Sequence, residues 1–181
     1  MKPVLLGSLL FVLATDALAH RLDEYLQATR VSVATNRIDL ALDLTPGVAV
    51  VDQLLVVIDK DRDGRVSEEE SAAYAERILK DIRIALDEKA LALRLAETSF
   101  PAQHEIKGGL GTIRIKAGVS VGQLTAGKHV LTLTNTHLPA ISVYLVNALA
   151  PKDKAIKIAH QTRDELQKNY RLEFSVRPSL P

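Results

Sequence analysis

Apolar and polar residues alternate strictly in several stretches of this chain, and this alternation limits the folds it can adopt. In RIDLALDL, every second residue from Ile38 to Leu44 is apolar, while the charged residues occupy the positions between them. NYRLEFSV repeats the pattern from Tyr170 to Val176. A period of two is typical of a strand with one buried face and one solvated face. The sequence therefore predicts antiparallel sheets and not helical layers.

Strands of this kind are expected at eight or nine places. The candidates are residues 29–34, 37–44, 83–87, 91–95, 112–116, 129–134, 142–147, 155–160 and 169–176. Turn residues such as Gly108-Gly109 and Pro151-Lys152-Asp153 separate them. Short strands at this spacing favour a mainly β fold, either an antiparallel β-sandwich or an open barrel. With 181 residues, 47% of them hydrophobic, we expect one domain.

The first nineteen residues have the features of an export signal. Lys2 precedes an apolar run over residues 4–14 that is too short to span a bilayer, and Ala-Leu-Ala at 17–19 fits the small-x-small cleavage rule. We therefore expect a signal peptide over residues 1–19 and a single β-rich domain over 20–181. The alternative is that the segment stays attached as an anchor. Because no later segment is long and apolar enough to span a membrane, we expect a periplasmic or secreted protein with no transmembrane segment in the mature chain.

Composition narrows the function classes further. The chain has no cysteine, which excludes cysteine metal sites and thiol nucleophiles. Its formal net charge is +1 and its basic residues are scattered, so we expect no binding to nucleic acid or to an anionic membrane. Motifs for a nucleophile elbow, a phosphate loop or a paired-histidine metal helix are missing from the sequence, and we expect no enzymatic activity.

A helical segment interrupts the strands at about residues 48–82. Pro46-Gly47 ends one strand, and the apolar residues from Val51 to Ile58 then recur at helical spacing, although 56–58 could equally form a short buried strand. A second helix is expected over about 67–82, with ion pairs from Glu76 to Lys80 and from Arg77 to Asp81 on its outer face. Its apolar stripe comprises Ala72, Ala75, Ile78, Leu79 and Ile82.

Between these helices lies DKDRDGRVSEEE, residues 59–70, in which three aspartates alternate before a glycine. A calcium loop of the corresponding length takes oxygen ligands from its first, third, fifth, seventh, ninth and twelfth positions, and it needs glycine at the sixth for a sharp turn. Gly64 occupies the sixth position. The ligand positions hold Asp59, Asp61, Asp63, the Arg65 carbonyl, Ser67 through a water, and Glu70 as a bidentate ligand.

A simpler interpretation uses the same residues without a metal. Ser67 and Glu70 have the spacing of a helix capping box, and residues 59–64 could form a plain polar turn. That interpretation does not account for three aspartates in alternate register followed by glycine, serine and glutamate at the required distances. We therefore interpret the stretch as a calcium site.

The stretch resembles the EF-hand family over the loop and its flanking helices, less than a fifth of the chain. The resemblance implies a Ca²⁺ ion held by Asp59, Asp61, Asp63, Arg65, Ser67 and Glu70. EF-hands usually occur in pairs, but this sequence has one such loop, and Ser71 stands where an apolar residue commonly follows the last ligand. A single hand in a calcium-rich extracytoplasmic space favours a structural ion over a switch.

The mature start HRLDEYLQATRVSV, the strands, the acidic helical insertion and LDEKALAL carry a second and weaker resemblance. Together they are similar to the extracytoplasmic domains that precede the membrane part of bacterial nickel/cobalt-type and hydrogenase/urease-accessory-type transporters. This similarity implies an envelope or membrane-transporter protein as a partner.

The leading expectation is an exported calcium-binding protein with a single structural EF-hand in a β-rich envelope interaction module. The alternative is a periplasmic accessory that binds copper or nickel through His20, whose amine and imidazole would lie on one residue after cleavage. That site would need a second histidine. His104, His129, His137 and His160 are available.

Overall fold

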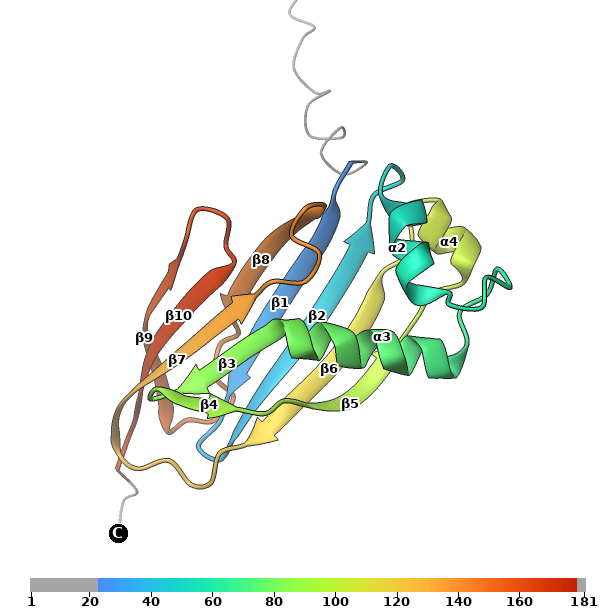
Figure 1. Ribbon diagram of the computed structural model, residues 1–181. Coiled ribbons are helices and arrows are strands. Elements are labelled where there is room, and N and C mark those ends of the chain that lie inside the picture. Colours follow the sequence, from blue (N-terminus) through green and yellow to red (C-terminus); the bar gives the residue numbers. More distant parts are fainter. Residues whose placement is uncertain (1–22, 179–181) are drawn as a thin grey trace, which may run out of the picture.

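Two five-stranded sheets face each other across a shared core in the computed structural model, which describes residues 23–178 (Figure 1). The first sheet has the order β5-β6-β2-β1-β8 and the second β4-β3-β7-β10-β9. The first comprises β1 Tyr25–Val33, β2 Arg37–Pro46, β5 Arg94–Ser99, β6 Ile113–Ser120 and β8 Ser142–Ala148. The second comprises β3 Ile82–Leu86, β4 Lys89–Leu91, β7 Gly127–Asn135, β9 Ile156–Arg163 and β10 Asn169–Val176.

The alternating stretches form the facing layers of this sandwich, which confirms the mainly β prediction. In β2 the even-numbered residues from Ile38 to Leu44 are buried, and in β10 those from Tyr170 to Val176 are buried. The residues between them lie on the outer faces. The period of two in the sequence thus decides which side of each strand enters the core.

Strand pairing departs from the sequence prediction in two places. β1 pairs with β8 in parallel, whereas the other pairs of the described chain are antiparallel. Residues 91–95 do not form one strand, since β4 ends at Leu91 in the second sheet and β5 begins at Arg94 in the first. The chain changes sheets between these residues, which alternation alone could not reveal.

Three helices lie in the connections between strands. α2 Val51–Ile58 and α3 Glu68–Asp81 lie between β2 and β3, while α4 Gln103–Lys107 lies between β5 and β6. Figure 1 shows α2 and α4 side by side at one end of the sandwich, with α3 leading into β3. The two predicted helices are confirmed, the short strand at 56–58 is wrong, and α4 is a further element that the sequence did not indicate.

The buried face of α3 differs from the predicted stripe. Ala75, Ile78 and Leu79 are buried as expected, but Ala72 is exposed and Tyr74 is buried instead. Neither expected ion pair forms within the described residues, and Asp81 contacts His137 instead. Tyr74 and Asp81 are instead engaged by polar side chains from distant segments, Tyr25 of β1 and His137 of the β7–β8 connection.

None of the helices within residues 23–178 is long and apolar enough to cross a bilayer. The predicted signal peptide over 1–19 and the mature terminus at His20 lie outside the described residues.

Candidate metal centre

Three carboxylates meet in the loop between α2 and α3. Asp59, Asp61 and Asp63 each offer one oxygen, and these oxygens lie within 4.8 Å of one another. The loop turns sharply, with Arg62 at φ +62° and Gly64 at φ +83°. Glycine adopts this left-handed conformation without steric cost, so Gly64 fits the role that its loop position required. The side chains of Asp59, Asp61 and Asp63, three of the six predicted ligand residues, therefore lie close together.

Asp59 differs from the other two aspartates because it is buried, with 7% of its surface exposed. Its Oδ2 accepts hydrogen bonds from the backbone N–H of Gly64, at 3.1 Å, and from Gln103 Nε2, at 3.4 Å. Its Oδ1 is also buried and has no hydrogen-bond donor within the described chain. A buried carboxylate oxygen without a partner carries a large desolvation cost, which a bound cation would offset.

The last two predicted side-chain ligands form the helix cap. Glu70 Oε2 accepts from the backbone N–H and the hydroxyl of Ser67, and Ser67 Oγ accepts from Glu70 N–H. Glu70 Oε1 accepts from Lys60 N–H at 2.5 Å. The hydrogen bonds from Ser67 and Lys60 hold the pKa of Glu70 below its usual value, so the carboxyl is ionised at neutral pH.

The capping-box interpretation is therefore confirmed for Ser67 and Glu70. Both carboxylate oxygens of Glu70 are engaged by these hydrogen bonds, and Glu70 is not part of the cluster formed by Asp59, Asp61 and Asp63. Glu70 reaches from the first turn of α3 to the second residue of the loop.

The loop also contacts a segment that is distant in the sequence. Gln103, the first residue of α4, contacts Asp59, and residues 64–66 line one concave surface together with residues 100–104. Val66 and Phe100 are partly buried against the core from the two sides of this contact. The connection between β5 and β6 thus lies against one side of the loop.

A chain of buried hydrogen bonds lies beneath α3, one turn beyond Glu70. Tyr25 and Tyr74 join their hydroxyls at 2.9 Å, Tyr74 Oη lies 2.9 Å from His137 Nε2, and His137 Nδ1 lies 2.7 Å from Asp81 Oδ2. The carboxylate can only accept, so Nδ1 carries the proton and Nε2 accepts from Tyr74. Tyr74 must then accept from Tyr25. We refer to these four residues as the α3 relay.

The surroundings of the α3 relay keep its two tyrosines and its histidine uncharged at neutral pH. Burial raises the pKa of Tyr25 and of Tyr74, and burial lowers the pKa of His137 more than its contact with Asp81 raises it. The backbone of His137 is held as well, since its N–H donates to Asn135 and its carbonyl accepts from Tyr144 Oη. The α3 relay therefore attaches α3 to β1 and to the β7–β8 connection.

His129 has a different environment from His137. Its Nδ1 lies 2.6 Å from Asp87 Oδ2 and its Nε2 lies 2.9 Å from the Thr125 carbonyl. Both partners are acceptors, so both contacts are hydrogen bonds only when the ring is protonated. Burial alone would lower the pKa of His129, but the hydrogen bonds to Asp87 and Thr125 raise it.

The histidines considered for the copper or nickel alternative do not gather into a ligand set among the described residues. His129 and His137 are each engaged with an aspartate. His104 and His160 are exposed. His20 lies outside the described part of the chain.

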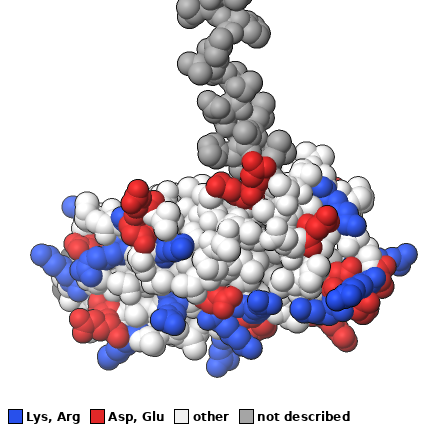
Figure 2. Space-filling view, turned by 45° about the horizontal axis from the view of Figure 1, so that its top comes forward, with Lys and Arg blue, Asp and Glu red and all other residues white. Residues whose placement is uncertain are grey.

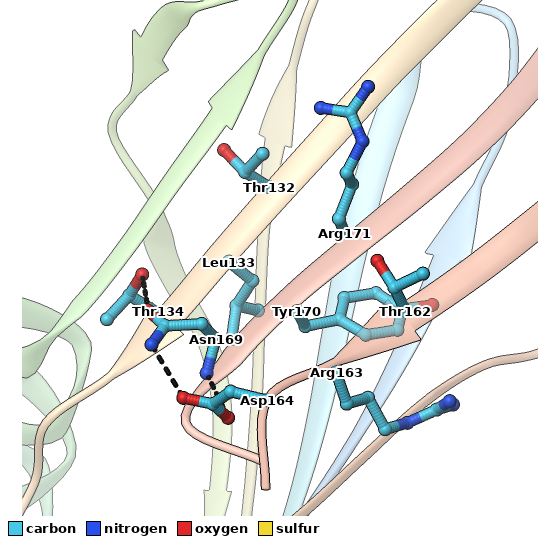
Figure 3. Close-up of a pocket in the computed structure, with 9 residues that line it drawn as sticks. All are labelled: Thr132, Leu133, Thr134, Thr162, Arg163, Asp164, Asn169, Tyr170 and Arg171. Carbon is cyan, nitrogen blue, oxygen red and sulfur yellow. Dashed lines mark hydrogen bonds between the residues drawn. The ribbon is translucent and has the colours of Figure 1, made fainter. Parts of the chain in front are cut away.

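A shallow pocket on the second sheet offers no comparable chemistry. Its lining side chains come from β7, β9 and β10, and Asn169 donates to Asp164 and accepts from Thr134 (Figure 3). Arg163 and Arg171 point away from each other, so they form no clamp for an anion (Figure 3). Arg163, Tyr170 and Arg171 bond to groups outside this pocket, namely Val146, Gln161 and Glu173.

Comparisons with known proteins do not assign this chain. No protein-family model matches it, and no curated protein matches it.

Sequence reasoning missed the buried polar residues beneath α3 and the residue that contacts Asp59, although a signal for some of them existed. Asn135 and His137 occupy the alternate positions that follow the buried residues Leu131 and Leu133. Gln27 lies two residues after Tyr25 in β1, so both are on the buried face of that strand. Polar residues at core positions of an alternating stretch indicate a buried network. No comparable signal marks Gln103, which reaches Asp59 through tertiary packing alone.

Proposed function

We propose that this is an exported calcium-binding protein in which one EF-hand-like loop stabilises a β-sandwich interaction module. The ligands are the carboxylates of Asp59, Asp61 and Asp63, the Arg65 carbonyl, Ser67 through a water, and Glu70. Hard oxygen ligands from a flexible loop suit Ca²⁺ better than a transition metal.

One observation carries the proposal: a buried Asp59 oxygen that has no donor within the described chain belongs to a cluster of three carboxylate residues. A plain polar turn gives no reason to bury that group. Removing an ionised carboxylate from water is unfavourable unless a cation or a donor compensates it. A calcium ion would satisfy Asp59 and relieve the repulsion among the three carboxylates at once.

A structural role fits the position of the loop better than a sensing role. α3 starts at the loop and ends in the α3 relay, whose histidine and tyrosines are buried. The contact with Gln103 ties the opposite side of the loop to the first sheet. An ion bound there would hold α2, the loop and α3 against both sheets. It would stabilise the fold because it binds only the folded state.

Calorimetric titration of calcium into the chelator-treated mature protein, with thermal melting of the same samples, tests this function. We expect one ion per chain and a dissociation constant of about 10⁻⁴ to 10⁻³ M, as in extracellular calcium modules. At calcium tenfold above that constant, the gain is about 1.4 kcal/mol. A gain of that size raises the melting temperature by roughly 3 to 6 °C in a domain of this length.

A matched pair of variants makes the test specific to the loop. Asp59→Asn should abolish the calcium-induced rise in melting temperature, because it removes the buried charge. Asp52→Asn should retain that rise, because Asp52 is an exposed residue of α2 outside the loop. The proposal is wrong if wild-type protein binds no calcium up to several millimolar, or if both variants respond like wild type.

A further inference from the structure

The aspartates of the loop are oriented mainly by the loop itself. Asp61 accepts a hydrogen bond from the backbone N–H of Asp63 at 3.1 Å, and Asp63 accepts one from that of Arg65 at 2.7 Å. Asp59 is the exception, because its Oδ2 also accepts from Gln103 Nε2 of α4, at 3.4 Å. Within the described chain, no other side chain from outside the loop hydrogen-bonds one of its carboxylates.

The contact with Gln103 determines which oxygen of Asp59 is free. A carboxylate only accepts hydrogen bonds, so the amide nitrogen of Gln103 must be the atom that faces it. Oδ2 thus has two donors, Gln103 Nε2 and the backbone N–H of Gly64, whereas Oδ1 is buried and has none within the described residues. The two donors hold the carboxylate by one oxygen and leave the other for a cation.

Asp59 is the loop aspartate whose orientation matters most for a cation. It is buried, whereas Asp61 and Asp63 are exposed, and the loop also carries three basic residues. Figure 2 shows acidic and basic side chains mixed at the end of the molecule where α2 and α4 lie. Water and neighbouring bases weaken the attraction between an exposed carboxylate and a cation, but they act much less on a buried one.

Gln103 belongs to a segment that is anchored in the core. It is the first residue of α4, in which Ile106 is fully buried. The backbone N–H of Gly111 donates to the Glu105 carbonyl. A side chain at position 111 has no room, since a Cβ atom there would lie 2.8 Å from Pro101 and 2.9 Å from the backbone nitrogen of Ile106. The connection between β5 and β6 is therefore fixed by contacts of its own, and it can support Asp59 from outside the loop.

We propose that Gln103 is a positioning residue of the calcium site, which holds Asp59 by Oδ2 so that Oδ1 binds the cation. Gln103 has this role only if calcium binds at the loop, so the role rests on the proposed function. Removing a residue that orients a metal ligand commonly weakens metal binding about tenfold to a hundredfold. At 3.4 Å the contact is long for a hydrogen bond, so we expect the lower end of that range.

The coupling between Gln103 and calcium must act in both directions, because coupling free energies between sites are reciprocal. If Gln103 strengthens calcium binding, calcium must strengthen the attachment of Gln103 and slow the local opening of α4. Backbone N–H groups of residues 105, 106 and 108–111 report that opening, since they donate to carbonyls within residues 102–106. A glutamine that served only the fold would not transmit calcium occupancy to these groups.

Calorimetric titration of calcium into the chelator-treated mature protein and its Gln103→Met variant tests this role. Methionine is unbranched like glutamine and of similar length, but it cannot donate a hydrogen bond. We expect the substitution to raise the dissociation constant about tenfold. Melting at increasing calcium extends the measurement to weak binding.

His104→Met is the matched control. His104 is the next residue of α4, is exposed, and lines the same concave surface without a hydrogen bond from its side chain to the loop in the described structure. This variant should bind calcium like wild type.

Amide hydrogen exchange provides a second readout. At calcium that saturates each protein, the ion should slow exchange of residues 105–111 several-fold more in wild type than in Gln103→Met, up to the same factor of about ten. Melting in chelator establishes that each variant is folded before its affinity and exchange rates are compared.

Failure of this role and failure of the calcium site give different results. If wild-type protein binds no calcium, the proposed function is wrong and Gln103 has no site to position. If wild type binds calcium and Gln103→Met binds it equally tightly, the site stands and the role of Gln103 is refuted. An equal loss of affinity in His104→Met refutes the role too. A lower melting temperature of Gln103→Met in chelator, with unchanged affinity and exchange, would identify a purely structural contact.

Discussion

Tyr74→Phe should cost more stability than Tyr25→Phe, although each substitution removes one hydroxyl from the same hydrogen bond. In the α3 relay, Tyr25 donates to Tyr74, and Tyr74 donates to His137. The two tyrosines and the histidine are each at most 2% exposed, so water cannot easily replace a lost partner. The difference between the two variants follows from the direction of these hydrogen bonds.

The costs can be worked out from the groups that each substitution leaves without a partner. Tyr25→Phe removes one donor and leaves Tyr74 still donating to His137, so we expect a loss of about 1 kcal/mol. Tyr74→Phe leaves both the Tyr25 hydroxyl and His137 Nε2 buried without partners. Each such group costs about 1 to 3 kcal/mol, so the two together cost roughly 2 to 6 kcal/mol.

The double variant provides the sharper test. Once Tyr74 is Phe, the Tyr25 hydroxyl is only a buried donor without an acceptor. Changing Tyr25 to Phe in that background should therefore restore about 1 kcal/mol or more. The sign of the Tyr25→Phe effect is thus expected to reverse between the two backgrounds.

Urea denaturation of the four proteins, all in chelator, measures these free energies of unfolding by linear extrapolation. Chelator removes any contribution from calcium binding at the other end of α3. Equal costs for Tyr25→Phe in both backgrounds would refute the proposed direction of the α3 relay. A larger cost for Tyr25→Phe than for Tyr74→Phe would refute it as well.

Three further predictions concern the histidines, the loop and the amino terminus. His129 should titrate above its ordinary pKa of about 6.5 and His137 below it in a proton NMR titration. The stabilisation from protonated His129 is complete below about pH 6.5 and is lost as pH rises through the folded pKa of His129. The stabilisation from neutral His137 is present above about pH 6.5 and is lost as pH falls through the folded pKa of His137. Shifts in the same direction for both would contradict the assignment. Glu70→Gln should weaken calcium binding at least about tenfold in calorimetry, whereas Glu69→Gln, one residue earlier and exposed, should change it little. Mass analysis of exported protein should find His20 as the first residue, and an intact residue 1 would show that the apolar segment is retained.

The sequence by itself predicted the layers of the fold and the local features of the loop. Alternation assigns the inward side of β2 and β10, and the spacing from Asp59 to Glu70 predicts the sharp turn at Gly64. The capping box follows from Ser67 and its neighbours in the same way. These features depend on residues close together in the chain, so period and spacing are sufficient to identify them.

Tertiary structure alone decided what surrounds that loop. The parallel pairing of β1 with β8 sets Tyr25 beside the β7–β8 connection, where it meets His137 and Tyr74 of α3. Asp81 then contacts His137 and not the neighbouring Arg77, and Gln103 reaches Asp59 across forty-four residues. Periodicity assigns a residue to a face but does not identify what lies opposite that face. That identity depends on the order of strands in each sheet and on the crossing of the chain between the sheets.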